Sequence, residues 1–149
     1  MKSKQSFFSV LVHLVSAGLF VGALAACSTA AVPPATAAPI TVGMSNFSLS
    51  PSATSAKAGE VTFVAINNST DLQHELIVIK SDLPADKLTV GSDNRVDEEA
   101  VTSIGEVSET DAGKSGTVTL KLEAGHYVLI CNIAGHYSQG MHVDFTVNP

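Results

Sequence analysis

Alternation of hydrophobic and polar residues predicts β-strands, and no stretch after residue 40 has the pattern of a long amphipathic helix. In residues 117–123 and 141–147 every second side chain is apolar. Residues 76–79 are apolar throughout, which is typical of a strand buried on both faces. Further strands are expected at 40–47, 60–66 and 126–131, which are rich in β-branched and aromatic residues. Short strands separated by turn residues predict an all-β sandwich or barrel.

The N-terminus departs from this pattern and has the composition of an export signal. Two lysines precede residues 7–26, which contain no Asp, Glu, Lys or Arg. Leu24-Ala25-Ala26-Cys27 then places small residues before a cysteine, and it resembles the lipobox of bacterial lipoproteins. We therefore expect a lipoprotein-type signal peptide at 1–26 and lipidation of Cys27. A plain secretory signal, cut near residues 23–25, is the alternative.

Residues 27–39 are rich in proline and alanine and contain too few large apolar side chains to form a core. We expect them to be a tether between the lipid anchor and a folded domain at 40–149. The protein would then be exported and held at the cell membrane or its periplasmic face, with the membrane as one of its partners.

Charge narrows the range of partners. The formal net charge of −6 argues against nucleic acid, which needs a basic surface. Residues 81–116 hold nine acidic and three basic residues, and this segment is long for a loop. Within it, 84–88 and 97–103 could each form a short helix. We interpret the segment as a solvated connection between strands, with a recognition surface for a basic partner as the alternative.

The candidate chemistry lies in the loop expected between the last two strands. Cys131, His136 and Met141 follow one another there at five-residue intervals. Thiolate and imidazole suit copper, zinc or iron, and the thioether favours copper. One Cys, two His and a distant axial Met form the blue-copper ligand set. The second imidazole has to come from elsewhere, and His74, at the start of an apolar strand, is the best candidate.

Two other histidines are not expected to be ligands. His126 shares a strand face with Val128 and Ile130, and we expect it to be a half-exposed structural residue. His142 alternates with Met141 along its strand, so its side chain should point away from the metal.

These motifs resemble those of the cupredoxins, which are small proteins with a type 1 copper site. The resemblance covers about 40–149 and is strongest in Gly125–Cys131, where Tyr127 precedes the cysteine by four residues. The gaps on both sides of the loop histidine are similar to those of auracyanin and sulfocyanin. The resemblance implies a cupredoxin-like Greek-key β-sandwich, with the acidic segment 81–116 as a long insertion.

The resemblance also implies roles for the candidate ligands of one type 1 copper ion. His74, Cys131 and His136 would be the equatorial ligands, and Met141 the weak axial ligand. Glu75 stands where many relatives have an Asn that helps to tie the two ligand loops together. Ala134 stands where several have Pro.

By the same resemblance, the protein is expected to be a one-electron carrier and not an enzyme. Electrons would reach a redox partner protein through the exposed edge of His136, amid an apolar patch that Ile133, Ala134 and Tyr137 could supply. An extracytoplasmic copper chaperone or copper buffer lipoprotein is the alternative, since the same four ligands could serve it. A copper enzyme would need further clustered histidines, and no small-molecule substrate is expected.

Overall fold

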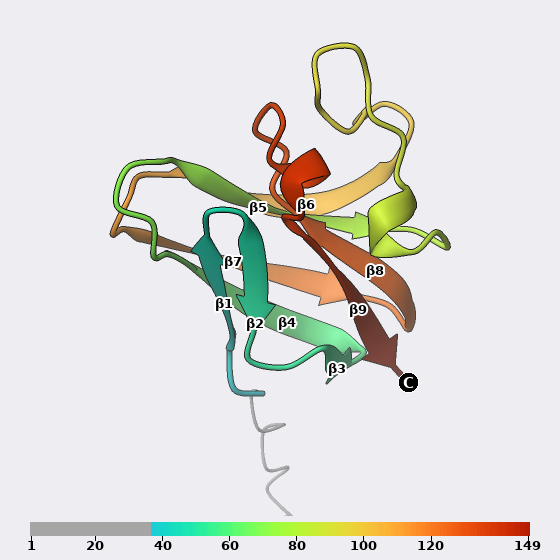
Figure 1. Ribbon diagram of the computed structural model, residues 1–149. Helices are drawn as coiled ribbons and strands as arrows, with labels where there is room; N and C mark the ends of the chain where they lie inside the picture. Colours follow the sequence, from blue (N-terminus) through green and yellow to red (C-terminus); the bar gives the residue numbers. More distant parts are fainter. Residues whose placement is uncertain (1–36) are drawn as a thin grey trace, which may run out of the picture. The chain divides into compact units, whose positions relative to one another are not determined.

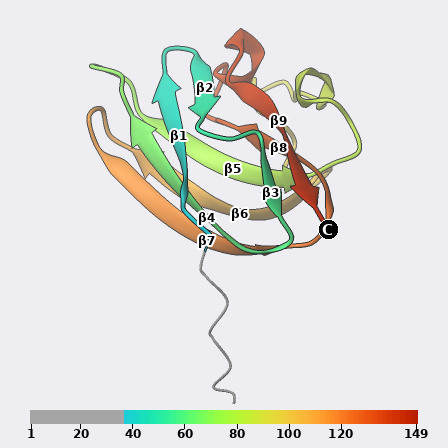
Figure 2. The ribbon, with the colours of Figure 1, turned by 90° about the horizontal axis from the view of Figure 1, so that it is seen from below.

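A computed structural model describes residues 37–149, which form two β-sheets packed face to face (Figures 1 and 2). The expected signal peptide, the lipidation site Cys27 and most of the expected tether lie outside the described residues. Within residues 37–149, no helix is long and apolar enough to cross a membrane.

The first sheet has the strand order β2-β1-β4-β7, and the second has the order β3-β9-β8-β5-β6. The strands are β1 (Ile40–Ser45), β2 (Ser48–Pro51), β3 (Ser55–Lys57), β4 (Gly59–Asn67), β5 (His74–Lys80), β6 (Thr102–Thr110), β7 (Ser115–Leu122), β8 (Gly125–Ile130) and β9 (His142–Asn148). All pairs are antiparallel except β1 with β4 and β3 with β9. The predicted all-β sandwich is confirmed.

All six predicted strands are present, and the structure adds β2, β3 and β6. The two short strands β2 and β3 have few buried side chains, so hydrophobic alternation did not reveal them. Strand β6 falls within the acidic segment and is mostly exposed, but its backbone pairs with β5. The helix suggested at 97–103 is therefore wrong, because β6 begins at Thr102. The short helix suggested at 84–88 is present only as a single 3-10 turn, η1 (Ala85–Lys87).

Strand β5 has a separate hydrophobic core on each face. Leu76 and Val78 point into the core between the sheets, whereas Ile77 and Ile79 belong to a second cluster. The second cluster is closed by Ala85, Leu88 and Val96 from the segment that follows β5, drawn yellow-green in Figure 1. Residues 81–101 are thus more than the solvated connection that we expected, because their apolar side chains cover the outer face of the second sheet.

Strand register brings the candidate ligands to one end of the second sheet. Ile77 of β5 lies opposite Ile130 of β8, so His74, three residues earlier, lies beside the chain that leaves β8. Ile130 is also paired with His142 of β9. Cys131 and Met141 are the next residues outward, and the Cys131 N–H donates to the Met141 carbonyl at 3.0 Å.

Candidate metal centre

Three of the four predicted ligands meet at one buried point. The Nδ1 atom of His74 lies 3.2 Å from Nδ1 of His136, which is 3.4 Å from Sγ of Cys131. All three ligand atoms lie within 4.8 Å of one another. His74 and Cys131 are fully buried and His136 is 7% exposed. Two imidazole nitrogens and one sulfur therefore face a common point inside the protein.

A tight turn carries the loop histidine inward. His136 directly precedes η2 (Tyr137–Gln139), and the N–H of His136 donates to the carbonyl of Ile133 at 2.8 Å. Gly140 ends the turn with φ of +116°, a conformation that favours glycine. The Met141 N–H then donates to the His136 carbonyl at 3.2 Å, which closes the loop.

Met141, the predicted axial ligand, is buried and its backbone lies beside two of the other predicted ligands. Its side chain is fully buried and belongs to the same hydrophobic cluster as Cys131. Its backbone is hydrogen-bonded to Cys131 on one side and to His136 on the other. The structure thus holds all four predicted ligands in one compact group of backbone and side-chain contacts.

A hydrogen bond to Asn46, on the side of the ring away from the other ligands, orients the imidazole of His74. Its Nε2 lies 2.9 Å from Oδ1 of Asn46, in the turn between β1 and β2, and Nδ2 of Asn46 donates to Asp71 at 3.1 Å. Since the amide oxygen can only accept, Nε2 carries the proton and Nδ1 keeps its lone pair. An orientation of this kind is typical of histidines that bind metal.

The same turn contacts the other imidazole. The ring of Phe47 meets the ring of His136 edge to face, with centroids 5.1 Å apart. Phe47 and Ile133 are half-buried and Ala134 is exposed, so part of each residue is accessible near His136 in the fold or in the sequence. Tyr137 does not join them, contrary to our expectation.

Tyr137 is buried because its hydroxyl is anchored in the 81–101 segment. The hydroxyl donates to the carbonyl of Ala85 at 2.7 Å and accepts from the N–H of Leu88 at 2.9 Å. The residue therefore fastens the ligand loop to η1 and is 4% exposed.

Comparison with known proteins places the chain in a family. The Sulfocyanin (SoxE) domain family matches the sequence over residues 42–149. The chain belongs to the sulfocyanin domain family. No curated protein sequence matches it at a significant level.

Solved structures agree with the sulfocyanin family in fold. Auracyanin from Roseiflexus castenholzii has a TM-score of 0.56 at 24% identity, over 74% of this chain and 95% of that one. Auracyanin A from Chloroflexus aurantiacus, described as a "blue" copper protein, has a TM-score of 0.53 at 22% identity, over 74% and 100%. Rusticyanin from Thiobacillus ferrooxidans has a TM-score of 0.51 at 17% identity, over 76% and 79%. These similarities confirm the cupredoxin fold.

The electrostatics of this sulfocyanin-family site favour neutral imidazoles but disfavour a free thiolate. Burial lowers the pKa of both His74 and His136, with the neighbouring imidazole adding to the effect at His74 and Arg95 at His136. Both rings are thereby kept neutral, as metal coordination requires. Burial raises the pKa of the Cys131 thiol, and hydrogen bonds from the backbone N–H groups of Glu75 and Ile133 oppose this increase.

Glu75 ties the two ligand loops together, although it is not the Asn that many relatives have. Its Oε1 accepts from the N–H of Asn132, the residue after Cys131, at 2.9 Å. Burial, and secondarily the carboxylate of Glu109, raises the pKa of Glu75 to about 7. A carboxylate therefore makes the link, and its charge depends on pH.

The two other histidines among residues 37–149 make contacts away from the three clustered ligand atoms. His126 is half-buried, and its Nε2 lies 2.9 Å from Oδ1 of Asp144. His142 packs against the ring of Tyr137, with centroids 5.0 Å apart. Among the described residues, neither belongs to the group of potential metal ligands.

The donor set fits one copper ion. A cysteine sulfur with two imidazoles and a nearby thioether is the set that copper adopts in blue sites. Together with membership of the sulfocyanin family, this set supports a single type 1 copper ion as the cofactor. Three residues that surround the ligands, Asn46, Arg95 and Asn132, could not be found from the sequence, because no motif marks them.

Proposed function

We propose that this protein is a one-electron carrier in which His74, Cys131, His136 and Met141 hold one type 1 copper ion. The convergence of His74, Cys131 and His136, with ligand atoms within 4.8 Å of one another, carries this proposal. A bound copper ion would supply the one-electron Cu(II)/Cu(I) couple.

The residues around the proposed ligands restrict their movement, which favours fast electron exchange. Asn46 holds the ring of His74 by a hydrogen bond, and Phe47 packs against the ring of His136. The backbone of Cys131 is bonded to that of Met141. Ligands held in this way move little when the charge of the site changes, and a small rearrangement allows fast electron exchange.

Electrons would pass through His136, because it is the only proposed ligand with any exposed surface. Phe47, which packs against the ring of His136, and Ile133 and Ala134, which precede it in the ligand loop, would form the apolar contact with a redox partner protein. A small interface is sufficient for such a transient complex. Exposed carboxylates at 93 and 97–99 lie in the loop next to the ligand loop, which supports a basic partner.

Attachment to a membrane is a separate part of the proposal and rests on the N-terminal sequence. Cys27 would carry the lipid, and residues 27–39 would tether the domain outside the cytoplasm. Such a tether lets the carrier diffuse in two dimensions along the membrane that holds its partner.

A visible absorption spectrum combined with a redox titration tests the carrier. The protein loaded with one Cu(II) per chain should absorb intensely in the visible range, through charge transfer from the Cys131 thiolate, and should bleach reversibly on reduction. Cys131→Ser should abolish the band. A colourless Cu(II) complex of the intact protein would overturn the proposal.

Copper transfer distinguishes a carrier from a chaperone. All four proposed ligands are buried, which favours retention of the ion over its release. We expect the loaded protein to exchange electrons faster than it loses copper to a chelating acceptor. Loss of copper on the timescale of electron exchange would favour a chaperone.

A further inference from the structure

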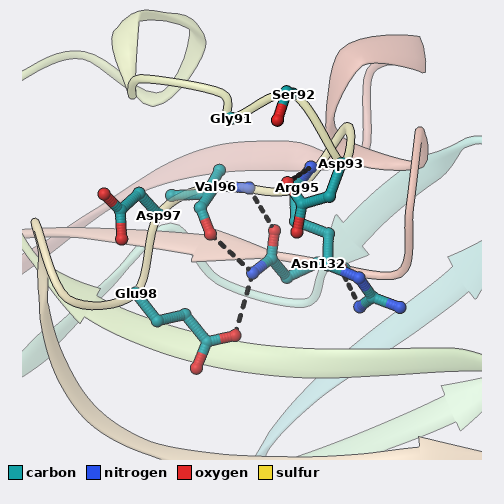
Figure 3. Close-up of a pocket in the computed structure, with 8 residues that line it drawn as sticks. All are labelled: Gly91, Ser92, Asp93, Arg95, Val96, Asp97, Glu98 and Asn132. Atoms are coloured by element: carbon teal, nitrogen blue, oxygen red, sulfur yellow. Dashed lines mark hydrogen bonds between the residues drawn. The ribbon is translucent and has the colours of Figure 1, made fainter.

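Asn132, the residue after Cys131, uses every polar group that it has. Its N–H donates to Glu75, and its carbonyl accepts from Nη1 of Arg95 at 2.7 Å. Its side-chain oxygen accepts from the N–H of Val96 at 2.6 Å, and Nδ2 donates to the Val96 carbonyl and to Oε1 of Glu98. Figure 3 shows the side chain between Val96 and Glu98. At 1% exposure, Asn132 connects the proposed copper ligand loop to another part of the chain.

The partner of Asn132 is the loop 91–98, which lies on the ligand loop at two places. One contact is the set of bonds around Asn132. The other is the N–H of Gly135, which donates to the carbonyl of Asn94 at 2.8 Å. Gly135 directly precedes His136, so the loop contacts the chain beside two proposed ligands. A charged side chain of this loop that is hydrogen-bonded to the ligand loop is therefore kept near the metal site.

Arg95 brings a positive charge to that position. Arg95 is half-buried, and its guanidinium donates to the carbonyl of Asn132, the residue after Cys131. Among residues 37–149, Arg95 takes part in none of the ion pairs, so no carboxylate in direct contact neutralises it.

The sign of the effect follows from charge. Oxidation adds one positive charge to the metal, and a fixed guanidinium repels that charge. The carboxylate of Glu98, bonded to the opposite side of Asn132, acts in the reverse direction. We propose that Arg95 is a positioning residue that both holds the backbone after Cys131 and raises the reduction potential of the copper site. The carboxylate of Glu98 lowers that potential. This inference rests on the proposed function.

Four single variants of the copper-loaded full chain test the proposal. The readout is the ratio of Cu(I) to Cu(II) affinity, obtained from the reduction potential. Arg95→Gln keeps a donor for the Asn132 carbonyl but removes the charge, and it should lower the ratio about threefold to tenfold. Arg95→Lys keeps the charge and should change the ratio less than twofold. Glu98→Gln keeps an acceptor and should raise the ratio.

Lys57→Gln is the matched control, since Lys57 lies in β3 beside Asn148, at the other end of β9 from Met141. It should leave the ratio unchanged. Hydrogen exchange at the amides of Val96 and Asn132 in the copper-free chain reports whether the loop stays in place. Glu98→Gln provides a second test of the charge effect should Arg95→Gln loosen the loop.

Three results would overturn the proposal. The first is a ratio for Arg95→Gln that equals that of the wild type or of Lys57→Gln. The second is a shift of Arg95→Gln and Glu98→Gln in the same direction, which would mean that structure and not charge is responsible. The third is an unchanged ratio in Glu98→Gln. A wild-type protein that forms no coloured copper complex would instead overturn the proposed function.

Discussion

The Nε2 atom of His74 lies 2.9 Å from the side-chain oxygen of Asn46, a residue 28 positions earlier in the chain. This bond joins the two sheets, because Asn46 lies between β1 and β2 and His74 begins β5. It also leaves Nδ1 free to bind a metal. The turn between β1 and β2 is therefore part of the metal site, although it supplies no ligand.

Asn46→Ala should weaken copper binding about tenfold to a hundredfold, the usual effect of removing the partner of a ligand histidine. Copper affinity is measured by competition with a chelator of known strength. Asn148→Ala, at the far end of β9, is the control and should bind copper as the wild type does. Equal affinity of Asn46→Ala and the wild type would show that the hydrogen bond does not orient His74.

Met141→Gln should lower the reduction potential while the protein stays folded and coloured. An amide oxygen is a harder donor than a thioether and stabilises Cu(II) over Cu(I). Met141→Leu, which removes the ligand at nearly constant volume, should raise the potential instead. Voltammetry measures both. If neither substitution moves the potential, Met141 is not the axial ligand.

Glu75→Gln should change how the stability of the copper-free protein depends on pH. The pKa of Glu75 is raised from 4.5 to about 7, so the folded state binds more protons than the unfolded state between these two values. Its contribution to stability is therefore lost as pH rises from the lower value to the higher one. Glutamine keeps an acceptor for the Asn132 N–H but cannot ionise.

The free energy of unfolding of Glu75→Gln, relative to the wild type, should therefore rise between pH 5 and 8 by roughly 2.5 kcal/mol. Urea unfolding at several pH values measures it. Below pH 4 the two proteins should differ little, since Glu75 is then protonated in both states. Parallel pH profiles of the two proteins would contradict the raised pKa.

Tyr137→Phe should lower the free energy of unfolding by about 1–3 kcal/mol, because the buried N–H of Leu88 loses its acceptor and the carbonyl of Ala85 loses its donor. Ser92→Ala, on the exposed part of the same segment, should have little effect. Urea unfolding compares them. Equal stability of Tyr137→Phe and the wild type would mean that this anchor of the 81–101 segment is not needed.

Cys27→Ala tests the membrane anchor. The wild type should fractionate with membranes, because a lipoprotein cysteine that carries several acyl chains is held stably. The variant should appear in the soluble fraction or keep its signal peptide. Recovery of the wild type entirely in the soluble fraction would show that Cys27 carries no such anchor.

The strands that carry the site were predictable because they alternate or are wholly apolar. Residues 76–79 and 141–147 bury side chains in the pattern that their sequence indicates. Cys131, His136 and Met141 could be grouped because they share one loop, and His74 because it opens a buried strand. The positions of these proposed ligands depend on local patterns and on strand ends, which can be recognised in the sequence.

The rest depends on contacts between distant segments. Strand β6 is polar on the outside and is held by backbone pairing with β5, which leaves no hydrophobic pattern to detect. Asn46 and Arg95 act on the site only because the fold brings the 46–47 turn and the 91–98 loop against it. No spacing in the sequence marks such residues, since their partners lie more than 25 positions away.

The 7% of His136 that remains exposed has a consequence for when copper can bind and when electrons can leave. The other three proposed ligands have no exposed surface. A metal ion that binds to the folded chain would therefore first meet the exposed edge of His136. The same edge is the proposed exit for electrons. On the proposed function, copper loading and electron delivery would therefore use the same opening, and a bound redox partner would also hinder the loss of copper.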